Sequence, residues 1–267
     1  MCRHLAYLGP PVPLGELLFD PPHSLVKQSW APRDMRGGGT INADGFGIGW
    51  YTPDGPVRYR RHTPIWSDTT LPGLTAALSS TAVLAAVRSA TVGMPVTEAA
   101  AAPFGEGPWL FSHNGRVTGW PGSMAKPASA LATDDLLSLD APTDAALLWA
   151  FARDRLRAGA TPADALASVV AEVERAAPGS RLNLLLTDGV TIAATTVGHS
   201  LSVRRRAAAA GGDPPFASGD PASVRRAADV VVASEPFDDD PGWQPIPDRT
   251  LLVATATALT TTPLGEL

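Results

Sequence analysis

The chain opens with the stretch MCRHLAYL (residues 1–8), and residues 2–8 have the apolar pattern of a short β-strand. The run Gly9-Pro10-Pro11 that follows predicts the end of that strand. Cys2 is the one cysteine in the sequence, so neither an intramolecular disulfide nor a four-cysteine zinc site can form. Because the Cys2 side chain is small, we expect Met1 to be removed, which leaves a thiol and a free α-amine on the same residue.

A cysteine in the first position carries the groups that amide hydrolysis requires. Its thiol has an ordinary pKa of about 8.5, so it needs a nearby base to form the nucleophilic thiolate at neutral pH. An α-amine titrates at about 7.7–8.0, and its neutral form can accept that proton. N-terminal threonine hydrolases use the same logic. The alternative is that Met1 stays in place and Cys2 only packs in the first strand.

The remaining sequence predicts groups of strands separated by helices. Strand patterns occupy residues 45–51, 57–61, 82–88, 108–113, 182–187, 191–196, 200–205, 230–234 and 250–255. Helical patterns occupy residues 14–20, 71–80, 143–157 and 162–176, with Thr143 and Thr161 as N-caps of the last two. We therefore expect an α+β fold of two stacked, mainly antiparallel sheets flanked by helices, in a single domain over 2–267 with a mobile loop around 207–223.

Composition argues against several kinds of partner. The formal net charge is −5 and no basic run exceeds Arg204-Arg205-Arg206, which is atypical of nucleic-acid binding. No stretch approaches about eighteen unbroken apolar residues, so we expect no membrane association. The N-terminus lacks the pattern of a signal peptide, which favours a cytoplasmic location. The five histidines show no ligand-like spacing, so we expect no metal and no cofactor. The oligomeric state stays open, a homo-oligomer included.

Residues Phe111–Gly115 end a strongly apolar run with Ser112-His113-Asn114-Gly115. The side-chain amide of Asn114 and a backbone N–H freed by a turn at Gly115 are the kinds of donor that an oxyanion hole needs. Asn-Gly is also one of the commonest hairpin turns, so a purely structural role is the alternative.

Two charged residues stand at the ends of predicted elements. Arg88 is the last residue of the predicted apolar strand at 82–88, where its planar guanidinium would suit a carboxylate of a ligand. A structural ion pair is the alternative role. Asp144 follows Thr143 at the start of a helix, where an acidic residue is ordinarily favourable to the helix dipole. It is also placed to bind a substrate ammonium group.

The glycines of Asn42–Trp50 alternate along a strand and do not have the spacing of a dinucleotide-binding loop. Alternating glycines instead let another backbone or a ligand approach one face of the strand closely. We therefore assign this segment to the wall of the site.

These motifs, taken in order, resemble the class II glutamine amidotransferases of the N-terminal nucleophile hydrolase superfamily. The resemblance rests on five segments of the sequence: Met1–His4, Asn42–Gly49, Arg88–Thr91, Ser112–Gly115 and Ala233–Pro236. It spans about residues 2–250 and implies a four-layer αββα sandwich. It also implies that Cys2 attacks a γ-glutamyl carbonyl through a thioester while Asn114 and the Gly115 N–H hold the oxyanion.

The resemblance implies a set of substrate contacts as well. Arg88, helped by Thr91, would bind the α-carboxylate of the glutamyl group, and Asp144 would bind its α-ammonium. His113 is also assigned to the substrate site. The chain departs from the family in having Val92 where a histidine often follows the threonine. The assignment of Asp144 rests only on chain order, with Asp134 or Asp135 as alternatives.

Two longer strings, at residues 86–95 and 233–240, are similar to a branch of this family that acts in ergothioneine biosynthesis. That branch hydrolyses the γ-glutamyl amide of γ-glutamyl-hercynylcysteine sulfoxide and releases glutamate, so the expected partner is a small γ-glutamyl molecule. The alternatives are a glutaminase subunit that supplies ammonia to a separate synthetase, and a catalytically silent binding module. Residues Phe237–Trp243 are a candidate surface for the cation of the leaving group, with a solvated acidic loop as the alternative.

Overall fold

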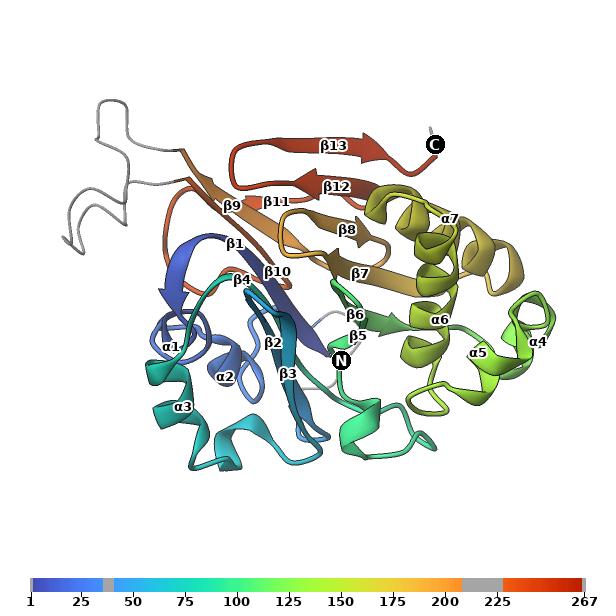
Figure 1. The fold of residues 1–267 in the computed structure, drawn as a ribbon, viewed down its shortest axis with the longest axis horizontal. Coiled ribbons are helices and arrows are strands. Elements are labelled where there is room, and N and C mark those ends of the chain that lie inside the picture. The colour runs from blue at the N-terminus through green and yellow to red at the C-terminus, as the bar shows by residue number, and fades with distance from the viewer. Residues whose placement is uncertain (1, 36–40, 208–227, 266–267) are drawn as a thin grey trace.

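The computed structural model describes residues 2–35, 41–207 and 228–265, and it contains two β-sheets packed face to face (Figure 1). The predicted mobile loop at 207–223 lies, apart from Ala207, outside the described residues. None of the helices in these ranges combines the length and apolar character that a bilayer crossing requires.

The first sheet has seven strands in the order β11-β9-β10-β1-β4-β2-β3. Its strands are β1 (Arg3–Pro13), β2 (Phe46–Thr52), β3 (Gly55–Arg61), β4 (Ser79–Val87), β9 (Ser202–Arg206), β10 (Asp229–Ala233) and β11 (Gln244–Pro245). The second sheet has six strands in the order β13-β12-β8-β7-β6-β5. Its strands are β5 (Phe104–Glu106), β6 (Trp109–Arg116), β7 (Arg181–Thr187), β8 (Ile192–Thr196), β12 (Thr250–Ala254) and β13 (Leu259–Pro263). The strand pairs are antiparallel.

Helices cover the outer face of each sheet. The longer ones, α6 (Asp144–Arg157) and α7 (Pro162–Ala176), pack on the second sheet, and short helices α1 (Gly15–Leu18), α2 (Leu25–Gln28) and α3 (Leu71–Ala77) pack on the first. The other short segments are α4 (Ala125–Ala128), α5 (Thr133–Leu137) and the 3₁₀ turns η1 (Ile65–Ser67), η2 (Glu98–Ala100) and η3 (Gly122–Met124). The layers therefore run helix, sheet, sheet, helix, which confirms the expected αββα sandwich.

Alternation along β1 builds two layers of the core from one strand. Leu5 and Tyr7 pack under α1–α3, whereas Ala6 and Leu8 face the second sheet, where they meet residues such as Leu185. Because β1 is the centre of its sheet, with β4 on one side and β10 on the other, the residue at its start is held rigidly.

Two predicted strand ends are wrong. β1 does not stop at Gly9–Pro11 but continues to Pro13, with an irregularity in pairing between Leu8 and Val12. β6 does not turn at Asn114-Gly115 but runs through them to Arg116, because Asn114 pairs with Asn183 and Gly115 with Leu182 on β7. The paired partner strand is a long-range contact that overrides the local turn preference.

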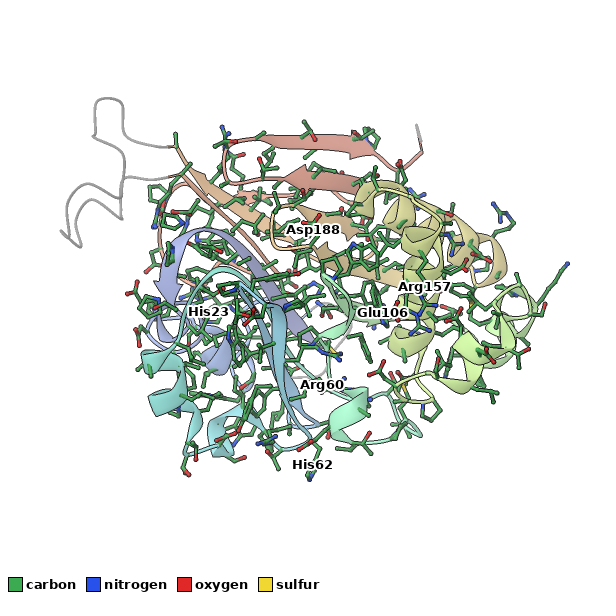
Figure 2. The ribbon with its side chains drawn as sticks, in the orientation of Figure 1. His23, Arg60, His62, Glu106, Arg157 and Asp188 are labelled. Atoms are coloured by element: carbon green, nitrogen blue, oxygen red, sulfur yellow. The ribbon has the colours of Figure 1, made fainter. Side chains whose placement is uncertain are left out.

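An ion-pair cluster ties β5 and α5 to α6, and we call it the paired-arginine network (Glu106, Asp135, Arg153 and Arg157). Nη2 of Arg157 lies 2.6 Å from Oε2 of Glu106, a pair that Figure 2 labels. Nη1 of Arg157 and Nη2 of Arg153 lie 2.8 and 2.6 Å from Oδ1 of Asp135. The network therefore anchors the body of the helix whose first residue is Asp144.

Candidate active site

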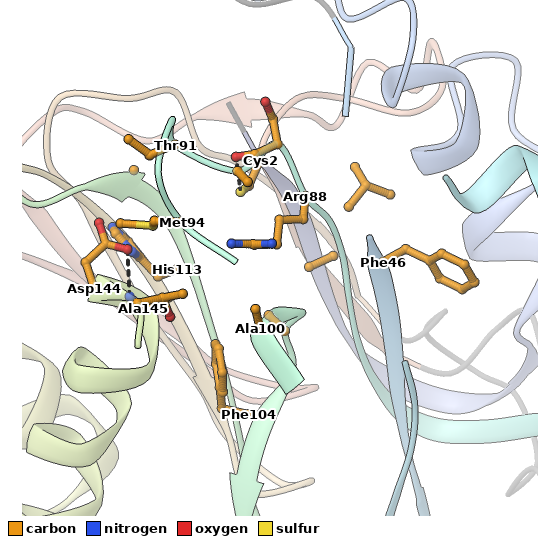
Figure 3. A pocket seen from close by; sticks show the side chains of 17 residues that line it. Cys2, Phe46, Arg88, Thr91, Met94, Ala100, Phe104, His113, Asp144 and Ala145 are labelled. Carbon is orange, nitrogen blue, oxygen red and sulfur yellow. Dashed lines mark hydrogen bonds between the residues drawn. The ribbon is translucent and has the colours of Figure 1, made fainter. Parts of the chain in front are cut away.

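Cys2 directly precedes β1, at the end of the central strand of the first sheet. It is partly exposed, and its Sγ lies 3.8 Å from the carbonyl oxygen of Ser89, just beyond β4. It lines a pocket with about 500 Å³ of empty space, part of it open to solvent (Figure 3). The sulfur thus has direct access to a cavity.

Six of the seven predicted site residues line this one pocket, although they come from distant parts of the chain. They are Cys2, Arg88, Thr91, His113, Gly115 and Asp144. Figure 3 shows Arg88 reaching in from one side and His113 and Asp144 lying on the other. The stacking of the two sheets brings them together. Their individual roles stay predictions.

Arg88 is buried and has no carboxylate partner among the described residues. Its Nη1 donates to the backbone carbonyl oxygens of Pro95 (2.9 Å) and Asp44 (3.4 Å). The structural ion pair considered from the sequence is therefore not formed within that part of the chain. A buried guanidinium held only by carbonyl groups retains the capacity to bind an anion. Thr91 lies nearby on the exposed loop that follows.

Asp144 is buried at the first position of α6, after the N-cap Thr143. Its Oδ2 accepts the Val117 N–H at 3.0 Å and its Oδ1 accepts the Ala145 N–H at 2.8 Å. No ion pair to Asp144 is found in the described ranges. These contacts orient the carboxylate and leave it without a counterion, which is what a site for a ligand ammonium requires.

The two alternatives to Asp144 lie elsewhere. Asp135 forms ion pairs with Arg153 and Arg157 in the paired-arginine network, and Asp134 is exposed at the start of α5. Neither lines the pocket. Of the three candidates, Asp144 is thus the one that lines the pocket, and its role in binding the ammonium group stays a prediction.

Asn114 is the predicted site residue that is not among those lining the pocket. Its Nδ2 donates to Oγ of Ser234 at 3.3 Å, and Ser234 Oγ also accepts the backbone N–H of His4 at 3.0 Å. The Asn114 Oδ1 is buried and unpartnered. Ser234 therefore orients the amide that is predicted to hold the oxyanion. In the sequence, Ser234 belongs to the string Ala233–Pro236, but no local pattern indicates this role.

Glycine is the one residue type that fits at position 115. A Cβ there would overlap the carbonyl oxygen of Arg181 and stand 2.7 Å from Nε2 of His113. The same His113 nitrogen lies 3.0 Å from the Arg181 carbonyl oxygen, so it donates to it. His113 is thus fixed at the pocket edge by β7.

Two further histidines, His4 and His199, are buried and interact with each other, which their scattered sequence positions did not suggest. Burial, followed by the charges of His113 and Arg3, lowers the pKa of His4 to about 3. Burial, followed by the charge of Arg181, lowers the pKa of His199 to about 4. Both are therefore neutral at pH 7, and the Nε2 of each has no hydrogen-bond partner among the described residues.

The alternating glycines serve the pocket wall indirectly. A Cβ at Gly47 would overlap the Ala102 carbonyl oxygen, and one at Gly49 would stand 2.6 Å from a methyl carbon of Leu110. Phe46 and Ala102 themselves line the pocket. The close approach expected at these glycines is thus made by protein backbone and side chain.

Residues Phe237–Trp243 are not among the residues that line the pocket, and the leaving-group surface expected there stays a prediction. The guanidinium of Arg204 makes cation–π contacts with both rings. It lies 5.1 Å from the centroid of Phe237 and 5.2 Å from that of Trp243. The Trp243 Nε1 donates to Asp238 Oδ1 at 2.6 Å. The aromatic faces and a carboxylate are therefore used within the fold.

Comparison with known proteins gives concordant matches. Residues 19–264 match the family described as glutamine amidotransferases class-II. The chain is 41% identical over 265 residues to the γ-glutamyl-hercynylcysteine sulfoxide hydrolase of Mycolicibacterium smegmatis, covering 99% of this chain and 100% of that one. It is 39% identical to the protein of the same name from Mycobacterium tuberculosis, covering 100% of this chain and 98% of that one.

A solved structure has the same fold. It is a glutamine aminotransferase class-II domain protein from Silicibacter pomeroyi, with a TM-score of 0.64, 24% identity and coverage of 98% of this chain and 99% of that one. Together, the family match over nearly the whole sequence and the two full-length relatives show that this chain belongs to the class II glutamine amidotransferases.

Proposed function

We propose that this chain hydrolyses the γ-glutamyl amide bond of γ-glutamyl-hercynylcysteine sulfoxide and releases glutamate and hercynylcysteine sulfoxide. The observation that carries the proposal is a pocket in which a partly exposed thiol stands beside a buried guanidinium and a buried carboxylate, neither of them ion-paired in the described ranges. These charges complement the α-carboxylate and α-ammonium of a glutamyl group. The names of the two full-length relatives support the identity of the leaving group.

In the first half of the reaction, the Cys2 thiol loses its proton to the neutral α-amine of the same residue. The thiolate then attacks the γ-carbonyl carbon, and the oxygen becomes an oxyanion held by the Asn114 amide and the Gly115 N–H. The C–N bond breaks, the ammonium returns its proton to the departing amine, and a thioester remains. Arg88 and Asp144 hold the glutamyl end throughout.

In the second half, water attacks the thioester carbon and gives a proton to the amine. The C–S bond breaks, glutamate leaves and the thiol regains its proton, so the enzyme returns to its starting state. Because the nucleophile is a reduced thiol, we also place the enzyme in the cytoplasm, where thiols are kept reduced.

The test is a comparison of kcat/KM for glutamate release from γ-glutamyl-hercynylcysteine sulfoxide and from glutamine. We expect at least a 100-fold preference for the sulfoxide, measured beside a Cys2→Ala control that should release no glutamate from either substrate. Equal values would point to a glutaminase subunit that supplies ammonia to a separate synthetase. Turnover by Cys2→Ala would contradict a Cys2 thioester altogether.

A further inference from the structure

Arg3 is buried directly behind the nucleophilic residue, with 3% of its surface exposed. Its Nη1 donates to the Cys2 carbonyl oxygen at 3.1 Å, its Nη2 donates to the Asp34 carbonyl oxygen, and its Nε donates to Oε1 of Glu235 at 2.9 Å. One guanidinium therefore connects the first residue of the predicted mature chain with a loop and with the end of β10.

Glu235 binds this guanidinium, and both oxygens of its carboxylate accept hydrogen bonds. Its Oε2 lies 3.0 Å from Nε2 of His23, labelled in Figure 2, and also accepts the backbone N–H groups of Arg33 (2.8 Å) and Asp34 (3.2 Å). Burial alone would raise the pKa of Glu235, but the hydrogen bonds from His23 and Arg3 outweigh burial and lower it. The carboxylate is thus ionised, and it fixes Arg3 in place.

The position of Arg3 has an electrostatic consequence for the amine of Cys2. A guanidinium stays protonated at every working pH. A fixed positive charge close to an amine disfavours the ammonium form and lowers the pKa of that amine. An α-amine with an ordinary pKa of about 7.7–8.0 would then be neutral, and able to accept a proton, at physiological pH.

Other charged or titratable groups surround Cys2, and they come from every neighbouring element. They are His4 on β1, Arg88 after β4, His113 on β6, Asp144 on α6, Asp34 between α2 and β2, His199 between β8 and β9, and Glu235 after β10. In the substrate complex proposed above, Arg88 and Asp144 would be neutralised by the glutamyl carboxylate and ammonium. Arg3 is the cation that touches Cys2 itself and that substrate would not neutralise.

We propose that Arg3, anchored by Glu235, is a positioning residue that fixes the backbone of Cys2 and keeps its terminal amine in the neutral, proton-accepting form. This inference rests on the proposed function only in taking Cys2 as the nucleophile with its own amine as the base. It adds a role for two charged residues that the catalytic scheme does not otherwise use.

The test uses the fact that the chain has one cysteine. Labelling with ¹⁵N-cysteine marks a single nitrogen, whose chemical shift can be followed against pH by correlation to the Cys2 α-proton, after intact-mass measurement has verified loss of Met1. We expect Arg3→Met to raise the pKa of the Cys2 amine by about one unit, whereas Arg3→Lys should stay near wild type. Glu235→Gln should lower it, because the charge of Arg3 is then less compensated.

A matched control is Arg33→Met, which removes a neighbouring arginine whose side chain is 60% exposed and does not contact Cys2. An amine pKa that is the same in Arg3→Met and wild type would overturn the inference, as would equal shifts in Arg3→Met and Arg33→Met. If Arg3→Met does not fold, an unchanged or raised pKa in Glu235→Gln would overturn it instead. The titration needs no substrate, so its failure is distinct from a failure to cleave the sulfoxide.

Discussion

Helix α6 contributes charged residues to both the pocket and the paired-arginine network. The charges differ in whether they have a counterion. At the start of α6, Asp144 faces the pocket without a counterion in the described ranges, and Arg88 across from it is held only by carbonyl oxygens. Further along α6, the buried Arg153 is paired with the buried Asp135 at 2.6 Å, and the partly exposed Arg157 pairs with Asp135 at 2.8 Å and Glu106 at 2.6 Å. The fold is thus able to pair buried charges, but it leaves those of the pocket unpaired.

This difference separates charges that stabilise the fold from charges that await a ligand. Burial of a charge without a counterion costs free energy, and only a bound partner recovers it. Binding sites commonly lower stability in this way. The same substitution placed in each region should therefore have opposite effects on activity and on stability.

The largest effect is expected from Arg88→Met. Loss of one partner of a buried charge pair costs about 2–5 kcal/mol of binding, so kcat/KM for glutamate release should fall by about 1,000-fold. The free energy of unfolding in urea should stay the same or rise, because a poorly compensated buried cation is removed. A large loss of stability with unchanged kcat/KM would mean that Arg88 is structural and that the comparison fails.

Arg153→Met makes the same change in the paired-arginine network. It removes the 2.6 Å contact to Asp135, although Arg157 still compensates that carboxylate. We expect the free energy of unfolding to fall by about 2 kcal/mol, with kcat/KM within about twofold of wild type. Urea denaturation and steady-state kinetics on one preparation test both halves. A kcat/KM loss like that of Arg88→Met would show that the two regions do not differ in function.

Acidification should destabilise the fold through the buried, neutral His4 and His199. The pKa of His4 is lowered to about 3 and that of His199 to about 4, so the folded protein keeps both neutral at pH 5. In the unfolded chain their ordinary pKa of about 6.5 makes them bind protons at that pH. The unfolded state therefore binds more protons, and stability should fall by about 3 kcal/mol between pH 6.5 and pH 5, roughly half of it from each histidine.

His4→Gln should flatten this pH dependence, and the exposed His62 offers a matched control as His62→Gln. Urea denaturation at a series of pH values gives the comparison. A slope that is the same in wild type and His4→Gln would show that the buried histidine does not cause the acid sensitivity.

Local signals in the sequence were sufficient for most elements. α7 runs over Pro162–Ala176 as predicted, because Thr161 caps it and proline starts it, and Thr143 caps α6 with its side chain on the Ala146 N–H. The hairpin of β7 and β8 also follows from its apolar strands and the turn at Asp188-Gly189. β5, β11 and β13 were not predicted, since they are short or polar and are stabilised by their neighbours in the sheets.

Local patterns identified the site residues as separate motifs, and only the family resemblance predicted that they form one site. The sequence Asn114-Gly115 predicts a turn, because turn preference is a local property. In the structure, both residues pair with β7 and therefore stay in a strand. The contact of Arg3 with Glu235 spans 232 positions, and no periodicity signals it. The rings of Phe237 and Trp243 looked free until the fold placed Arg204 against both.

The sequence by itself determined most strands and helices of this protein, its candidate thiol nucleophile and its family resemblance, because these depend on neighbouring residues and on short motifs. Only the tertiary structure decided that Asp144 rather than Asp134 or Asp135 lines the pocket, and that Arg88 is unpaired within the described ranges. The physical reason is that burial and charge pairing depend on which distant residues the stacked sheets bring within a few ångströms of each other.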